Sequence, residues 1–236
     1  MHINRLILEF ERKFVEPLTA DMTRTLEVTC HKSGDVNHGS NFIGNAVVLI
    51  GIEAASQFTN PHTQEEEDSF RETAKVTYDS LGGEHNTKYD GSKLAKQFMK
   101  RYFDDWFNER KEFGVPLHEL IWAFRNSHAH AFYPYYRRRF NSKEISGAVD
   151  WLYKDGVQRT GIAIAEVDAN FDAYKSQLYK VEGEVFRMCP QVLFVFFKRA
   201  LNRFIDQVRA HNETQAQFFE NYSRLSECYG FDPKQA

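Results

Sequence analysis

Arginine, an amide and two histidines stand within six consecutive positions, Arg125-Asn126-Ser127-His128-Ala129-His130. Guanidinium and amide groups bind anions, and imidazole takes up and releases protons near neutral pH. This grouping therefore indicates a functional site. A solvated helix end, at which histidine complements the helix dipole, would show the same residues. The spacing alone does not decide between these two interpretations.

The segment that holds these residues, PLHELIWAFRNSHAHAF from Pro116 to Phe132, has the apolar spacing of a helix with one buried side. On such a helix Asn126 and His130 share one face, and Arg125 and His128 share another. His128 and His130 would point about 160° apart, which argues against a shared metal. We therefore expect no metal site and no cofactor.

The spacing Arg-x4-His, with a polar residue after the arginine and an apolar helix before it, resembles the signature of HEPN domains (higher eukaryotes and prokaryotes nucleotide-binding). In this sequence the signature consists of Arg125, Asn126 and His130. The resemblance extends over about residues 42 to 132, which contain an apolar helix at 42–58 and a second helix at 94–107.

Length and helical spacing predict a mainly α fold in one domain over residues 1–236. The resemblance implies that its core is a HEPN-like four-helix bundle. It also implies a homodimer that brings two signatures to one cleft, and metal-independent cleavage of RNA that leaves a 2′,3′-cyclic phosphate. His130 would act as acid or base, Arg125 would hold the phosphate, and Asn126 would orient one of them. Such an endoribonuclease would suit a defence or toxin system with an antitoxin or other protein partner.

Three consecutive arginines follow the signature at Arg137, Arg138 and Arg139, with tyrosines at 133, 135 and 136. Arginine interleaved with aromatic residues is typical of surfaces that bind single-stranded RNA, so Tyr133 and the three arginines are candidate RNA-binding residues. An ordinary basic strand with alternate residues in solvent would have the same sequence.

The remaining pattern predicts the elements that position these residues. Helical spacing covers residues 2–29, where Pro17 kinks or divides the helix, and returns from Asp168, from Val185 to Val208 and from Glu213 to Cys228. Between them, short β-rich runs at 135–140, 148–153 and 160–167 predict a β-hairpin or three-stranded insert at about 135–167.

Charge and cysteine content narrow the class of protein. The formal net charge of −3 disfavours a protein that coats nucleic acid over its whole surface. Three well-separated cysteines form no disulfide framework or thiolate zinc motif. Charged residues begin too early for a signal peptide, and the longest apolar run, Val192 to Phe197, is far too short for a membrane span. We expect a cytoplasmic protein without membrane contact.

Two other functions fit the sequence. The chain could be a non-catalytic HEPN module that binds RNA, a nucleotide or a partner protein. It could also be a hydrolase of another class, although the sequence contains no nucleophile elbow, P-loop or dinucleotide-binding glycine pattern.

Overall fold

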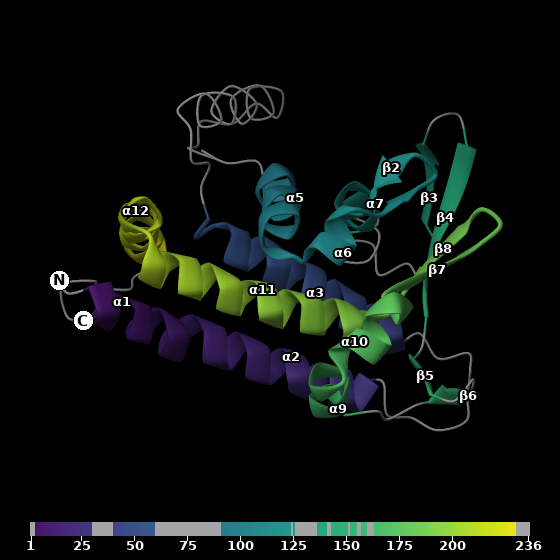
Figure 1. The fold of residues 1–236 in the computed structure, drawn as a ribbon, viewed down its shortest axis with the longest axis horizontal. Coiled ribbons are helices and arrows are strands. Elements are labelled where there is room, and N and C mark those ends of the chain that lie inside the picture. Colours follow the sequence, from purple (N-terminus) through teal and green to yellow (C-terminus); the bar gives the residue numbers. More distant parts are fainter. Residues whose placement is uncertain are drawn as a thin grey trace.

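Helices form most of the fold, and small β-sheets lie at one end of it (Figure 1). The computed structural model describes residues 3–29, 40–59, 91–123, 125, 136–140, 143–150, 152–154, 157–159 and 163–229. The mainly helical class predicted from the sequence is confirmed. None of the helices in these ranges is both long and apolar enough to cross a membrane.

The N-terminal helical stretch is continuous but changes its winding. It consists of α1 (Ile3–Phe10), the π-helix η1 (Glu11–Val15) and α2 (Glu16–Thr29). The Glu16 N–H donates to the Glu11 carbonyl, which is a wider turn than that of an α-helix. Pro17, which follows directly, has no N–H to donate, and its ring crowds the carbonyl of the preceding turn. The wider turn therefore fits the predicted disturbance at Pro17.

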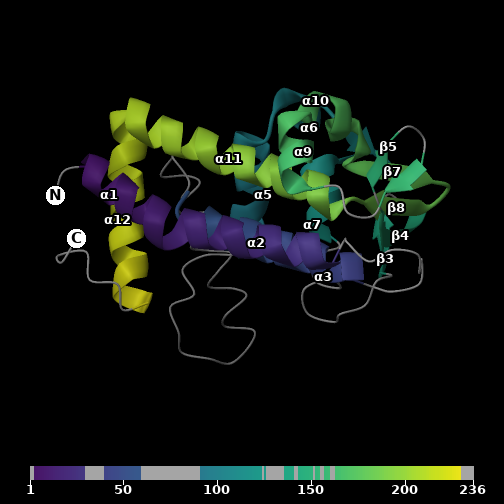
Figure 2. The same ribbon diagram turned by 90° about the horizontal axis from the view of Figure 1, so that it is seen from below.

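Three long helices run side by side: α2, α3 (Ser40–Ser56) and α11 (Pro190–Ala210) (Figures 1 and 2). A fourth, α5 (Gly91–Tyr102), packs across α3 and α11. Close approach is possible because α3 has glycines where its neighbours touch it. A Cβ on Gly44 would lie 2.8 Å from a Leu26 methyl of α2, and one on Gly51 only 2.0 Å from the Met22 methyl.

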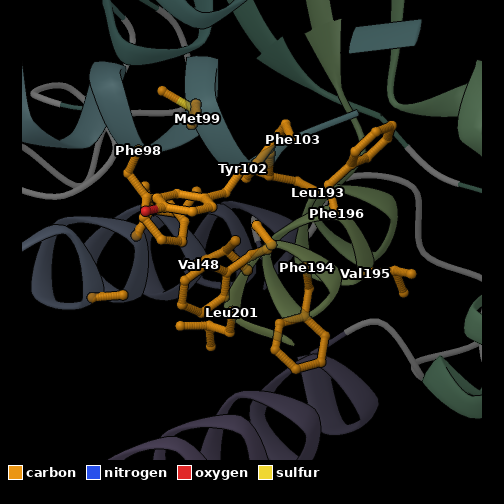
Figure 3. Packing of buried hydrophobic residues seen from close by; sticks show 14 of the residues in the cluster. Val48, Phe98, Met99, Tyr102, Phe103, Leu193, Phe194, Val195, Phe196 and Leu201 are labelled. Carbon is orange, nitrogen blue, oxygen red and sulfur yellow. The ribbon is translucent and has the colours of Figure 1, made fainter. Parts of the chain in front are cut away.

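The core lies between α3, α5 and α11 and is rich in phenylalanine (Figure 3). The apolar run of α11, Val192 to Phe197, is buried on every side. The last helix, α12 (Asn212–Tyr229), crosses the end of the bundle near α1 (Figure 2), where Phe218 packs on Phe10 and Phe204. The apolar helix α3 packs against α2, α5 and α11 of the same chain.

The predicted helix at 94–107 is two helices. The first, α5, ends at Tyr102, and α6 (Asp105–Asn108) begins after Asp104, whose side chain accepts a hydrogen bond of 3.0 Å from the Phe107 N–H. An aspartate at this position ends one helix and caps the next. A short hairpin, β1 (Lys111–Glu112) and β2 (Val115–Pro116), then leads into α7 (Leu117–Ala123). Its turn has positive φ at Phe113 and Gly114.

The sheet is larger than the predicted insert and includes residues from outside it. Its order is β3-β4-β8-β7, with β4 and β8 parallel and the other pairs antiparallel. Its strands are β3 (Tyr136–Phe140), β4 (Lys143–Val149), β7 (Tyr179–Glu182) and β8 (Val185–Met188). A separate hairpin pairs β5 (Leu152–Lys154) with β6 (Val157–Arg159).

Two predicted elements in this region are wrong. The strand predicted at 160–167 is replaced in its second half by α9 (Ile164–Ala169), and α10 (Phe171–Tyr174) and the 3₁₀ turn η2 (Lys175–Gln177) follow. The helix predicted from Val185 begins only at Pro190, because residues 185–188 form β8, in which Phe186 and Met188 are buried in alternation. Four residues are too few to distinguish that alternation from the first turn of a helix.

Candidate functional site

Arg125, the first residue of the signature, is helical and lies just beyond α7. Its Nη2 forms an ion pair with Oε2 of Glu53 on α3. The Arg125 side chain is 12% exposed and that of Glu53 28%. The guanidinium carbon also lies 5.5 Å from the centre of the Trp122 ring, within the range of a cation–π contact. Two contacts from different elements therefore fix the position of this guanidinium.

The sequence of α7 explains why Arg125 faces α3. Leu117, Leu120 and Ile121 are buried and anchor the helix against the core. Trp122 and Arg125 are three residues apart, so both lie on one flank of the helix. Because α7 packs on α5, and α5 packs on α3, this flank comes within reach of Glu53.

Glu53 was missed as a functional residue, although the sequence held a signal for it. It is the one charged residue in the seventeen-residue helix α3, SNFIGNAVVLIGIEAAS. A lone carboxylate in an apolar helix is costly to bury unless a cation pairs with it. The sequence could therefore have predicted a basic partner for Glu53, but not that the partner would be Arg125.

The other signature residues, Asn126 and His130, lie outside the described residues, as do His128 and Tyr133. Their placement relative to Arg125 stays a prediction. The backbone of Arg137, Arg138 and Arg139 lies on β3, which is an edge strand of the four-stranded sheet as far as the described residues show. Arg138 stands opposite the buried Ile145 in the β3–β4 ladder. The RNA-binding role of these arginines stays a prediction as well.

His118 stands on the same flank of α7 as Arg125, seven residues earlier, and the sequence had suggested no role for it. Its side chain is 15% exposed, and its Nε2 lies 4.0 Å from Oε1 of Glu119. Burial lowers the pKa of His118 below its usual value; Glu119 opposes the shift, and Lys100 and Lys96 add to it. The imidazole is therefore neutral at pH 7 and lies in a positively charged neighbourhood.

No group of three or more histidine, cysteine, aspartate or glutamate side chains suited to a metal ion occurs within the described ranges. His128 and His130 fall outside these ranges, so the expectation that they share no metal is not tested.

Comparison with protein-family models, with curated proteins and with solved structures finds no match to this chain. The resemblance to HEPN domains therefore depends on the residues of the signature and on the helices around it.

Proposed function

We propose that this chain is a HEPN-like, metal-independent endoribonuclease, active as a homodimer. The observation that supports this most is the fixed, mostly buried guanidinium of Arg125, held by Glu53 and Trp122. A residue that must bind a phosphate in a defined orientation needs such support, because a freely rotating arginine loses entropy on binding.

In this proposal Arg125 holds the scissile phosphate and neutralises charge on the phosphorane. A guanidinium has five N–H donors, more than a single carboxylate can accept, so Glu53 can orient it without blocking phosphate binding. His130 transfers protons at the 2′-hydroxyl or at the leaving 5′-oxygen, and Asn126 orients His130 or a phosphate oxygen. The products are a 2′,3′-cyclic phosphate and a 5′-hydroxyl.

In the proposed mechanism one imidazole acts as base and a second as acid, and each chain has one histidine in the signature. A homodimer supplies the second. Ile43 and Ile50 of α3 are 44% and 48% exposed and lie on one face of that helix, seven residues apart. Ile50 is one turn from Glu53, which holds Arg125. A dimer that buries these isoleucines would bring the two Arg125 side chains towards a common cleft.

A cleavage assay in EDTA with end-labelled single-stranded RNA tests the proposal. Wild-type protein should cut the RNA, and Arg125→Ala should lower the rate at least about 100-fold, the scale expected for loss of a charge clamp. Arg209→Ala is the control, because Arg209 also joins two helical segments through a glutamate, with 2.8 Å between Nη2 and Oε1 of Glu11, although its side chain is 46% exposed against 12% for Arg125. Equal losses in both variants would attribute the effect to stability and remove support for the clamp.

A non-catalytic module is the second candidate, and the Arg125–Glu53 pair fits it too, because the pair joins α7 to α3 whatever the function. In that case wild-type protein would bind RNA or a partner but leave RNA intact in the same assay.

A further inference from the structure

The helix α5 carries an unusual concentration of positive charge. Its twelve residues, GSKLAKQFMKRY, include three lysines and an arginine and no acidic residue, in a chain whose formal net charge is −3. Lys93, Lys96 and Lys100 follow the spacing i, i+3, i+7 and so form one stripe along the helix. The opposite side is buried in the core through Leu94, Ala95, Phe98, Met99 and Tyr102. In the stripe (Lys93, Lys96 and Lys100) Lys100 is exposed, whereas Lys93 and Lys96 are half-buried at the edge of that packed side.

The stripe lies beside the helix that carries the candidate site. Lys96 Nζ forms an ion pair of 3.0 Å with Oε2 of Glu119 on α7. His118, which directly precedes Glu119 on α7, is close enough to Lys96 and Lys100 for both to lower its pKa. His118 and Arg125 are seven helical positions apart on one flank, a separation of about 10 Å. The stripe therefore lies beside the flank of α7 that leads to Arg125, although α7 itself, LHELIWA, contributes no lysine or arginine to it.

We infer that Lys93, Lys96 and Lys100 bind successive phosphates of a single-stranded RNA whose chain continues to Arg125; this rests on the proposed function. The stripe is linear and about 10 Å long, which suits a chain of phosphates. A membrane surface would call for exposed apolar residues beside the lysines. The large apolar side chains exposed within the described ranges, Leu8, Ile43, Ile50 and Phe219, lie on α1, α3 and α12 instead.

The test compares two triple variants of equal charge, both in the His130→Ala background so that the RNA stays intact. The stripe variant is Lys93→Gln, Lys96→Gln, Lys100→Gln. The control is Lys13→Gln, Lys175→Gln, Lys180→Gln, which removes three lysines that pair with carboxylates at 3.1, 2.7 and 2.6 Å, as Lys96 does at 3.0 Å. Fluorescence anisotropy with a labelled single-stranded RNA is measured between 50 and 200 mM salt, a range over which phosphate contacts change affinity by orders of magnitude.

The stripe variant should bind RNA at least about tenfold more weakly at low salt, and its slope of log K against log salt should be shallower by about 2, because three phosphate contacts are lost. The control should keep the slope of the parent. The inference is wrong if the stripe variant binds RNA less than about fivefold more weakly than the His130→Ala parent. It is also wrong if the two triple variants lose RNA affinity equally. Loss of binding to anionic vesicles without loss of RNA binding would also overturn it, in favour of a membrane surface.

Cleavage is measured separately on chains with His130 intact, so the two claims fail independently. If wild-type protein cleaves RNA but the stripe variant binds RNA as tightly as its parent, the proposed function is supported and the RNA-binding role of the stripe is wrong. If the stripe variant loses RNA binding but wild-type protein does not cleave RNA, the stripe is supported as an RNA-binding surface and the proposed nuclease function is wrong. Should the triple variant unfold, the single charge reversal Lys100→Glu at an exposed position must weaken RNA binding at low salt, or the inference fails.

Discussion

The guanidinium of Arg125 and the carboxylate of Glu53 form an ion pair between residues 72 positions apart in the sequence. The pair connects the end of the helix that carries the signature to the apolar helix α3. Both side chains are mostly shielded from water, whereas in the pair of Lys13 and Glu9 the lysine is 52% exposed. Removal of either partner from the Arg125–Glu53 pair therefore leaves a charge with little solvent to compensate it.

A double-mutant cycle should detect this coupling. Glu53→Ala and Arg125→Ala should each destabilise the fold, and the coupling energy of the pair should be about 1–3 kcal/mol by urea denaturation. The more exposed pair of Arg209 and Glu11 is the control and should give less than about 1 kcal/mol. Equal coupling in the two cycles would show that Glu53 does not hold Arg125 more firmly than a surface pair does.

Lysine should not replace arginine at position 125. A lysine keeps the charge but cannot donate two parallel hydrogen bonds to a phosphate. Arg125→Lys should therefore keep most of the stability and still lower RNA cleavage by about 100-fold. The matched variant Arg209→Lys should cleave at the wild-type rate. Cleavage by Arg125→Lys within about threefold of wild type would mean that position 125 supplies charge only.

His118 should make the fold less stable in acid. Its folded-state pKa lies below the usual 6.5, so the unfolded chain binds the proton more readily. The free energy of unfolding therefore increases with pH between the lowered folded-state pKa and 6.5. Below that window the full loss of stability caused by protonation of His118 is present. Urea midpoints at pH 7.5 and 5.5 should fall less on acidification in His118→Gln than in wild type. An identical fall in both proteins would show that His118 does not titrate with folding.

The dimer should depend on α3. Light scattering at micromolar concentration should give twice the mass of the chain for wild type, and Ile50→Lys should give the monomer with little cleavage, because it places a charge on the proposed contact. Leu8→Lys changes a residue that is 53% exposed on α1 and should leave dimer and cleavage unchanged. A monomeric wild-type protein that cleaves RNA would contradict the two-chain site.

Long elements were predictable from the sequence because their periodicity extends over many turns. The helices at 2–29, 42–58 and 213–228 agree with the structure to within a few residues. The sheet was only partly predictable, since β4 pairs in parallel with β8, some 40 residues further along the chain, and no local pattern specifies that partner. The hairpin turn of β7 and β8 did carry a signal in Gly183, whose φ is +62°.

Among the described residues, the sequence singled out Arg125 but not the side chains that surround it. Arg125 stands out by its residue type and spacing, whereas its partner Glu53 is recognisable only as a lone charge in an apolar helix. The sequence suggested no role for His118. Its relation to Lys96 and Lys100 arises from the packing of α7 on α5, which sequence spacing does not reveal.

The most direct test of the central claim is cleavage of single-stranded RNA in EDTA by wild type, His130→Ala and His128→Ala at equal folded fraction. Wild type should yield 2′,3′-cyclic phosphate ends, His130→Ala should be slower by at least about 100-fold, and His128→Ala by less than about tenfold, because only His130 has the spacing of the signature. Full cleavage by His130→Ala, or a larger loss in His128→Ala, would contradict the assignment of His130 and with it the proposed HEPN-like mechanism.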